Sequence, residues 1–222
     1  MELLKYFDSR FKKGEPKKVK KYPFITISRE TGCGAVDIAK LLIKELNTRG
    51  EQWKYIDKDI LFDSAKKLKL DQSKINYIFE AKTKTHADEI LSALSNKYYK
   101  SDRAVRRTIA DVVTHFAEEG RVIIVGRAGA AITANMKKST HVRLVAPISW
   151  RVDSLMKRRK ETHSDTEKYI LDVDKKRQKL MTFFCEKKPQ DICFDITINC
   201  AKFSRKQIVE IIINTLEQRK LI

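Results

Sequence analysis

A short glycine-rich turn near the start of the chain has the residue types to hold a phosphate group. In the stretch FITISRETGCGAVDIAKLLIKEL (24–46), strand-like residues run into Gly32 and Gly34, and apolar residues at helical spacing follow. Such a turn presents successive backbone N–H groups to an anion, and the following helix adds its positive amino end. The pattern predicts a phosphate-binding loop, with a plain strand-to-helix turn as the alternative.

This loop departs from the usual pattern G-x-x-x-x-G-K-[ST] at the positions that contribute side chains. Ala35 stands where the lysine belongs, so the cation that contacts the β- and γ-phosphates is missing. Asp37 lies two positions further on, and its carboxylate is a candidate catalytic group and Mg²⁺ ligand. Arg29 is a candidate for the missing charge, or it pairs with Glu30. The candidate nucleotide-binding residues are Ser28, Thr31, Gly32, Cys33, Gly34, Ala35 and Val36.

Length and composition are typical of a globular protein. The chain has 222 residues, of which 42% are hydrophobic, enough for one α/β domain or two small ones. No segment has the length of a membrane span and no secretory signal opens the chain, so we expect a cytoplasmic protein.

The four cysteines form no C-x-x-C pair, which favours free thiols over zinc. Cys33 is either a reactive thiol at a helix start or an inert small residue.

The formal net charge of +18 points to anionic partners. A field of this sign attracts nucleotides, nucleic acid or an anionic membrane face, although a lysine-rich solvated surface explains it equally well. Residues 1–22 are especially basic and predict an amino-terminal extension. No usual RNA-binding motif occurs, so nucleic-acid binding ranks behind the binding of a nucleotide donor and a small acceptor, and no membrane partner is expected. The oligomeric state stays open.

From Tyr22 onwards, strand and helix patterns alternate, which predicts a three-layer α/β fold: a five-stranded parallel sheet with helices on both faces. The expected strands are 24–27, 53–56, 121–125, 141–145 and 194–198. The expected helices are 35–48, 58–69, 72–98 in pieces, 102–119, 127–134, 148–161, 164–184 and 204–219. Ligands of such sheets bind at the carboxyl ends of the strands, so the residues after each strand are the candidates for chemistry.

Four stretches together resemble the cytidylate kinase-like family. ITISRETGCGAVDIAK (25–40) is similar to the family's I-T-I-S-R-E-x-G-S-G-G-R-E-I-A, and YIDKDIL (55–61) to its Y-D-K-E-I-L. VIIVGRAGAAI (122–132) is similar to its V-I-V-G-R-G. HVRLVAPISWRVDSLMKRR (141–159) with DVDKKR (172–177) is similar to its fourth strand, A-P-x-x-x-R helix and lid. The resemblance implies a P-loop nucleotide kinase fold over residues 23–222, with a helical acceptor lobe at about 58–101 and a lid at about 151–190.

The resemblance implies transfer of the γ-phosphoryl group of ATP, with Mg²⁺, to a small acceptor such as a pyrimidine nucleoside monophosphate. The family as a whole lacks the loop lysine, but it usually carries an arginine where this chain has Val36. Nucleotide binding is therefore implied more firmly than phosphoryl transfer. A protein that binds a nucleotide and reports it without turnover stays the alternative.

The resemblance also implies roles for residues outside the first loop. Gly126 and Arg127 follow the third strand, and Arg127 would hold the acceptor's phosphate, unless it is a surface arginine. Asp57 faces the acceptor or caps a helix, and Arg107 faces the acceptor lobe. The lid would bring Arg151, Arg158 and Arg177 to the donor phosphates, with ordinary solvated basic helices as the alternative.

Overall fold

Five parallel strands form the centre of the fold in the computed structural model, which describes residues 22–50, 52–57, 103–185 and 194–222. The strands are β1 (Phe24–Arg29), β2 (Lys54–Ile56), β3 (Val122–Val125), β4 (Ser139–Val145) and β5 (Ile196–Asn199). They lie in the order β2-β3-β1-β4-β5, and every neighbouring pair is parallel. This arrangement confirms the predicted five-stranded parallel sheet.

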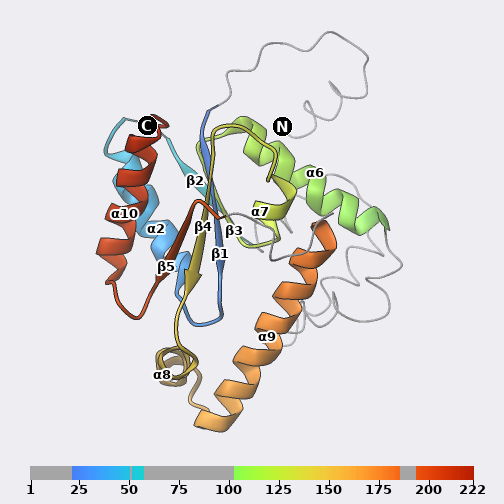
Figure 1. Cartoon of the computed structure of the whole chain (residues 1–222), viewed down its shortest axis with the longest axis vertical. Helices are drawn as coiled ribbons and strands as arrows, with labels where there is room; N and C mark the ends of the chain where they lie inside the picture. The colour runs from blue at the N-terminus through green and yellow to red at the C-terminus, as the bar shows by residue number, and fades with distance from the viewer. Residues whose placement is uncertain (1–21, 51, 58–102, 186–193) are drawn as a thin grey trace.

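Helices cover both faces of the sheet (Figure 1). The described helices are α2 (Ala35–Asn47), α6 (Arg103–Glu119), α7 (Gly129–Ile132), α8 (Ile148–Arg159), α9 (His163–Phe184) and α10 (Arg205–Gln218). Helices α2 and α10 pack together on one face, α6 and α7 lie on the other, and α8 and α9 extend beyond the carboxyl ends of the strands. The result is the three-layer architecture expected from alternating strands and helices.

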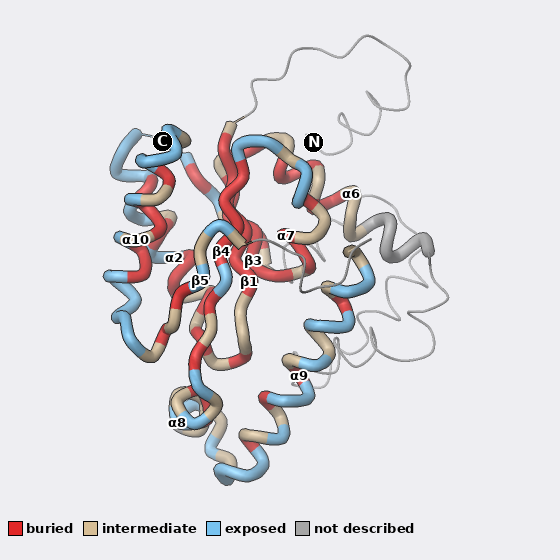
Figure 2. Tube along the Cα trace, in the orientation of Figure 1, coloured by how far each residue is buried: buried red, intermediate tan, exposed pale blue. Residues whose placement is uncertain are grey.

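The sheet is buried on both faces because its strands are apolar at successive positions. Ile25 and Ile27 of β1 contribute to the core beneath α2 and α10, whereas Phe24 contributes to the core beneath α6. In Figure 2 the three central strands β1, β3 and β4 are mostly buried, and the helices are buried mainly on the sides that face the sheet. The apolar positions 38, 42 and 46 of α2 supply one such side, as their helical spacing predicts.

Two helix starts are fixed by side-chain caps. Ser204 precedes α10 and forms a capping box with Gln207, in which each side chain accepts the other's backbone N–H. Thr162 precedes α9 and accepts the backbone N–H of Asp165. These caps place Arg205 at the first position of α10 and set the start of the long helix that passes over the candidate site.

Some element boundaries differ from the prediction. Strand β4 begins at Ser139 rather than at 141, because Ser139 and Thr140 are buried beside Phe24 and Ile25 of β1 despite their polar side chains. Helix α7 covers only Gly129–Ile132 rather than 127–134. The backbone at 126–128 is left-handed, with φ of 78°, 54° and 53°, and this turn keeps the three residues out of the helix.

Other expectations concern chain outside the described residues. Apart from Tyr22, the expected basic extension over 1–22 lies outside the described residues. The same is true of the acceptor lobe expected at about 58–101, with its helices at 58–69 and 72–98. The segment expected to form the lid, about 151–190, is described up to 185, as most of α8 and the whole of α9. None of the described helices is long and apolar enough to cross a bilayer.

We expect one ion-pair cluster of the fold to make stability fall in acid. The carboxylate of Glu119 contacts His115 Nε2 at 3.3 Å and Lys54 Nζ at 2.6 Å. The hydrogen bond from His115, and then that from Lys54, lower the pKa of Glu119 from 4.5 to about 2. Because the folded-state pKa is lowered, the stabilisation is complete above pH 4.5 and is lost as the pH falls toward 2.

Glu119→Gln should therefore lower the free energy of unfolding at pH 7 by about 1 kcal/mol. This is less than the pKa shift alone would give, because solvent screens the partly exposed ion pair. At pH 2 the variant and the parent protein should unfold at the same denaturant concentration. Glu210→Gln, at an exposed position of α10, is the control and should change neither value. A loss for Glu119→Gln that is the same at both pH values would contradict this origin. Urea titrations at the two pH values measure the difference.

Candidate functional site

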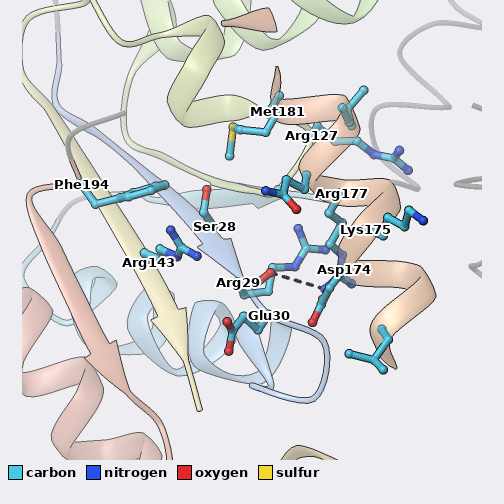
Figure 3. Close-up of a pocket in the computed structure, with 15 residues that line it drawn as sticks. Ser28, Arg29, Glu30, Arg127, Arg143, Asp174, Lys175, Arg177, Met181 and Phe194 are labelled. Carbon is cyan, nitrogen blue, oxygen red and sulfur yellow. Dashed lines mark hydrogen bonds and ion pairs between the residues drawn. The ribbon is translucent and has the colours of Figure 1, made fainter. Parts of the chain in front are cut away.

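A cavity of about 480 Å³ opens at the carboxyl ends of β1, β3 and β4, beside α9 (Figure 3). In Figure 3, Arg143 and Phe194 lie on one side of the cavity, and Asp174, Lys175 and Arg177 of α9 lie on the other. The full lining comprises Ser28, Arg29, Glu30, Gly126, Arg127, Ala128, Arg143, Leu171, Asp174, Lys175, Arg177, Gln178, Leu180, Met181 and Phe194. Parallel strands end at one edge of a sheet, which is why segments so distant in sequence meet here.

Four arginines line this cavity, namely Arg29, Arg127, Arg143 and Arg177. The pKa of Arg29 is lowered well below its usual value, first by burial and then by the positive charges of Arg177 and Arg127. The carboxylates of Asp174 and Asp57 act in the opposite direction but do not offset the lowering. Arg29 is thus a buried guanidinium group beside two other guanidinium groups, an arrangement that favours an anionic ligand.

Arg29 packs directly against the turn after β3. A β-carbon on Gly126 would lie 1.7 Å from Arg29 Nη1, so only glycine leaves room for this guanidinium group. The next two residues, Arg127 and Ala128, keep the left-handed backbone that Gly126 begins. Such a conformation is costly for residues other than glycine and is often found at functional sites. The two predicted candidates Arg29 and Arg127 are thus brought to one place by Gly126.

The first part of the loop is bonded to α9 through Asp174. The Thr31 backbone N–H and hydroxyl both donate to Asp174 Oδ1, at 2.8 and 2.7 Å. Arg177 Nη1 in turn donates to Thr31 Oγ1 at 2.9 Å and lies 3.6 Å from Asp174 Oδ1. Arg177 is therefore held between the loop and the cavity, and Asp174 orients it.

Arg151 supports the loop from within the protein. Its side chain is only 9% exposed and forms an ion pair with Asp174. Nε donates to the Ala146 carbonyl at 3.0 Å, and Nη1 lies 3.4 Å from the Thr31 carbonyl. The Cβ of Arg151 would lie 3.0 Å from a β-carbon on Gly32, so α8 packs tightly on the loop. In this arrangement Arg151 binds protein groups, and its predicted role on donor phosphates stays a prediction.

The second part of the loop, residues 33–36, packs towards the core. Cys33 and Ala35 are buried beneath α2 and α10, and Val36 packs against the same core. The thiol of Cys33 interacts with that of Cys200, a contact that raises the pKa of Cys33 and is reinforced by burial. Cys33 is thus a buried thiol with a raised pKa, which argues against the reactive alternative.

Asp37 lies on the outside of the loop between two arginines. Its Oδ2 atom is 3.2 Å from Arg158 Nη2 and 3.0 Å from Arg205 Nη2. Two guanidinium groups at these distances make the carboxylate a poor ligand for Mg²⁺ in this arrangement. Among the described residues, no group of three or more metal-ligating side chains occurs either. The proposed metal role of Asp37 therefore does not fit the groups around it.

The remaining candidates are placed less completely. Asp57 follows β2 and lies close enough to Arg29 to affect its pKa. Arg107 lies in α6, but its side chain belongs to the part of the chain that is not described. Sequence reasoning missed Arg143, Phe194 and Arg205. Arg143 lies within β4 rather than after it, so an inspection of strand ends could not find it.

The family model of the cytidylate kinase-like family matches residues 24–202, which is most of the chain. The chain belongs to the cytidylate kinase-like family. This membership confirms the resemblance of the four sequence stretches and identifies the protein as a member of a kinase-like, nucleotide-binding family with the P-loop fold. A search of curated protein sequences finds no match.

Solved structures support the fold of this cytidylate kinase-like protein. An uncharacterized protein from Eubacterium ventriosum is 19% identical, with a TM-score of 0.62 over 89% of this chain and 99% of its own. Shikimate kinase from Acinetobacter baumannii in complex with shikimate is 14% identical, with a TM-score of 0.50 over 91% of this chain and 97% of its own. At these identities the likeness extends to the fold and not to the substrate.

Proposed function

We propose that this protein transfers the γ-phosphoryl group of ATP to a small phosphate-bearing acceptor, with a nucleoside monophosphate such as cytidylate as the first candidate. One observation carries the proposal. Arg29, Arg127 and Arg177 line a single cavity beside the loop of a kinase-like family. The cavity volume of about 480 Å³ is adequate for a ligand of that size.

The charge of the cavity supports a phosphate rather than a neutral acceptor. Guanidinium groups bind phosphate oxygens through paired, charge-assisted hydrogen bonds. Burial, and after it repulsion from Arg177 and Arg127, lowers the pKa of Arg29, and a bound phosphate would relieve that repulsion. On the opposite wall, the Phe194 ring lies 5.6 Å from the Arg143 guanidinium, which leaves an apolar surface and a further cation for the rest of the acceptor. The described residues therefore fit a small anion with a larger organic part.

Positioning and charge stabilisation are what a protein must supply for phosphoryl transfer. ATP with Mg²⁺, when bound, supplies the phosphoryl group and part of the charge neutralisation. In the protein, Arg29 and Arg127 would hold the acceptor's phosphate at the cavity. Arg177, bonded to Thr31 of the loop, would stabilise negative charge between the acceptor and the loop. Asp174 would keep Arg177 in that place.

Nucleotide binding without turnover is the second candidate function. Ala35 is buried and supplies no charge to the loop, and Asp174 occupies the Thr31 backbone N–H. Both features weaken the loop as a site for transfer while leaving the cavity intact. The two functions differ in whether ADP forms.

Calorimetric titration together with an ADP-release assay tests the proposal. ATP with Mg²⁺ is titrated first, followed by a panel of nucleoside monophosphates, and ADP is measured in each mixture. The proposal expects ATP binding and ADP release that depends on one acceptor. ATP binding without ADP release for any acceptor would favour the second candidate. Absence of ATP binding would reject both.

Arg29→Ala is expected to weaken binding of the phosphorylated acceptor about tenfold, because one charge-assisted contact in a partly desolvated site is lost. Arg49→Ala is the matched control, since Arg49 is an exposed arginine that pairs with Glu217 at the far end of α2. The control should bind the acceptor as the parent protein does. Equal affinities for all three proteins would remove Arg29 from the acceptor site. Calorimetric dissociation constants provide the comparison.

A further inference from the structure

A second cationic site lies on the outside of the loop and does not line the cavity of Figure 3. It consists of Arg158 from the end of α8, Arg205 from the start of α10, and Asp37 from the first turn of α2. The three side chains belong to elements far apart in the sequence, and both arginines contact the same carboxylate oxygen. We refer to these three residues as the outer arginine cluster.

Arg205 lies beside Gly34, the second glycine of the loop. A β-carbon on Gly34 would lie 3.5 Å from Arg205 Nη2, 3.6 Å from Nε and 3.9 Å from Cζ. Nη2 and Nε are both nearer to this point than Cζ, so the edge of the guanidinium group that carries these nitrogens faces Gly34. The adjacent residue is Ala35, which stands where a phosphate loop has its lysine. Arg205 brings a cation to the neighbourhood from which that lysine is missing.

The outer arginine cluster is accessible and carries an excess of positive charge. The side chains of Arg158 and Arg205 are 58% and 49% exposed, and that of Asp37 is 35% exposed. One carboxylate faces two guanidinium groups, so the cluster keeps a formal charge of about +1. Exposed ion pairs of this kind contribute only about 0–1 kcal/mol, so an incoming anion can replace Asp37 at low cost.

We propose that Arg158 and Arg205 bind the polyphosphate of the donor nucleotide, and that Arg205 takes the place of the missing loop lysine. Asp37 then acts as the counter-ion of the empty cluster rather than as a ligand of Mg²⁺. The arginine fork suits the non-bridging oxygens of neighbouring phosphates, and the loop backbone beside Gly34 lies within reach of the same group. This inference rests on the proposed function, because it assigns the donor to this side of the loop and leaves the cavity to the acceptor.

Titrations without metal separate the two roles of Asp37. ATP and inorganic triphosphate are titrated into the parent protein and into Arg205→Gln, Arg205→Lys and Asp37→Asn, first without and then with Mg²⁺. Lys206→Gln is the matched control, because Lys206 is the exposed cation next in sequence. Thermal melts confirm that each variant folds. Positions 37, 205 and 206 are all at least partly exposed, so little change in the thermal midpoint is expected.

The expected result is specific to each variant. Arg205→Gln should weaken the metal-free binding of both ligands about tenfold, Arg205→Lys should restore part of the loss, and Lys206→Gln should have no effect. Asp37→Asn should tighten metal-free binding several-fold, because the competing carboxylate is gone.

Other results would overturn the inference in identifiable ways. ATP binding that is unchanged by Arg205→Gln would remove Arg205 from the donor site while leaving the proposed function intact. If Asp37→Asn weakened ATP binding only in the presence of Mg²⁺, Asp37 would be a metal ligand, and the counter-ion role would be rejected. Binding of triphosphate through Arg205 without any binding of ATP would retain the cluster as a polyphosphate site and reject the proposed function. Failure to bind either ligand would reject both.

Discussion

Asp174→Ala is expected to lower the free energy of unfolding by about 3 kcal/mol. Asp174 accepts two hydrogen bonds from Thr31 and forms an ion pair with Arg151, whose side chain is only 9% exposed. Removing the carboxylate leaves the buried Arg151 charge with Glu30, at 3.5 Å, as its one remaining anionic partner among the described residues. For a chain of this length the midpoint of thermal denaturation should fall by roughly 6–12 °C.

Asp172→Asn provides the matched control for this prediction. Asp172 lies on the same helix and is 56% exposed, where it pairs with Lys176. Asp172 itself is exposed and Lys176 is 14% exposed, so the loss of this pair should cost about 1 kcal/mol, well below the loss expected for Asp174→Ala. The double variant Asp174→Ala with Arg151→Met should recover part of the stability, because no unpaired buried charge remains. If Asp174→Ala were no more destabilising than Asp172→Asn, the link between the loop and α9 would not be a stabilising element.

Arg127→Gly is expected to reduce kcat/KM for the phosphorylated acceptor by about 10²–10³-fold without lowering the thermal midpoint. Arg127 has a left-handed backbone, with φ of 54°, in the turn where Gly126 and Ala128 are also left-handed. Glycine adopts this conformation without the cost that a β-carbon imposes, which offsets the contacts that the arginine side chain loses. A loss of function with retained stability is the signature of a residue that is strained for its role.

Two further substitutions sharpen this second prediction. Arg127→Lys keeps the positive charge but not the paired N–H donors of the guanidinium group. Its kcat/KM should be about tenfold higher than that of Arg127→Gly. Lys137→Ala removes a charge from an exposed position near the amino end of β4, at the opposite edge of the sheet, and should leave kcat/KM unchanged. A lower thermal midpoint for Arg127→Gly would show that Arg127 serves the fold, and an unchanged kcat/KM would remove it from the acceptor site.

Most of the architecture could be predicted from the sequence, because the strands are short apolar runs separated by helical patterns. Val122–Val125 is the clearest case, since a run of buried β-branched residues permits no other element at that length. The prediction was wrong at the start of β4, where Ser139 and Thr140 are polar in type but buried by pairing with β1. Polarity is a local property, whereas burial also depends on the neighbouring strand.

The candidate site could be predicted only where its residues follow strands. Ser28, Arg29 and the Gly126-Arg127 pair were found because the carboxyl ends of parallel strands share one edge. Arg143 lies within a strand and Arg205 begins a helix, and no local pattern distinguishes either from the many surface arginines of a chain with 47 lysines and arginines.

The sequence by itself determined the family, the parallel sheet and a glycine-rich loop without the lysine of the usual phosphate-binding pattern. The tertiary structure alone decided what each arginine contacts. Arg151 and Arg158 lie seven residues apart on α8 and both reach the loop, as their spacing predicts. Yet Arg151 is buried against Asp174, and Arg158 is exposed beside Asp37 and Arg205. Helical spacing sets the direction of a side chain, but its burial and its partners depend on how separate elements pack together.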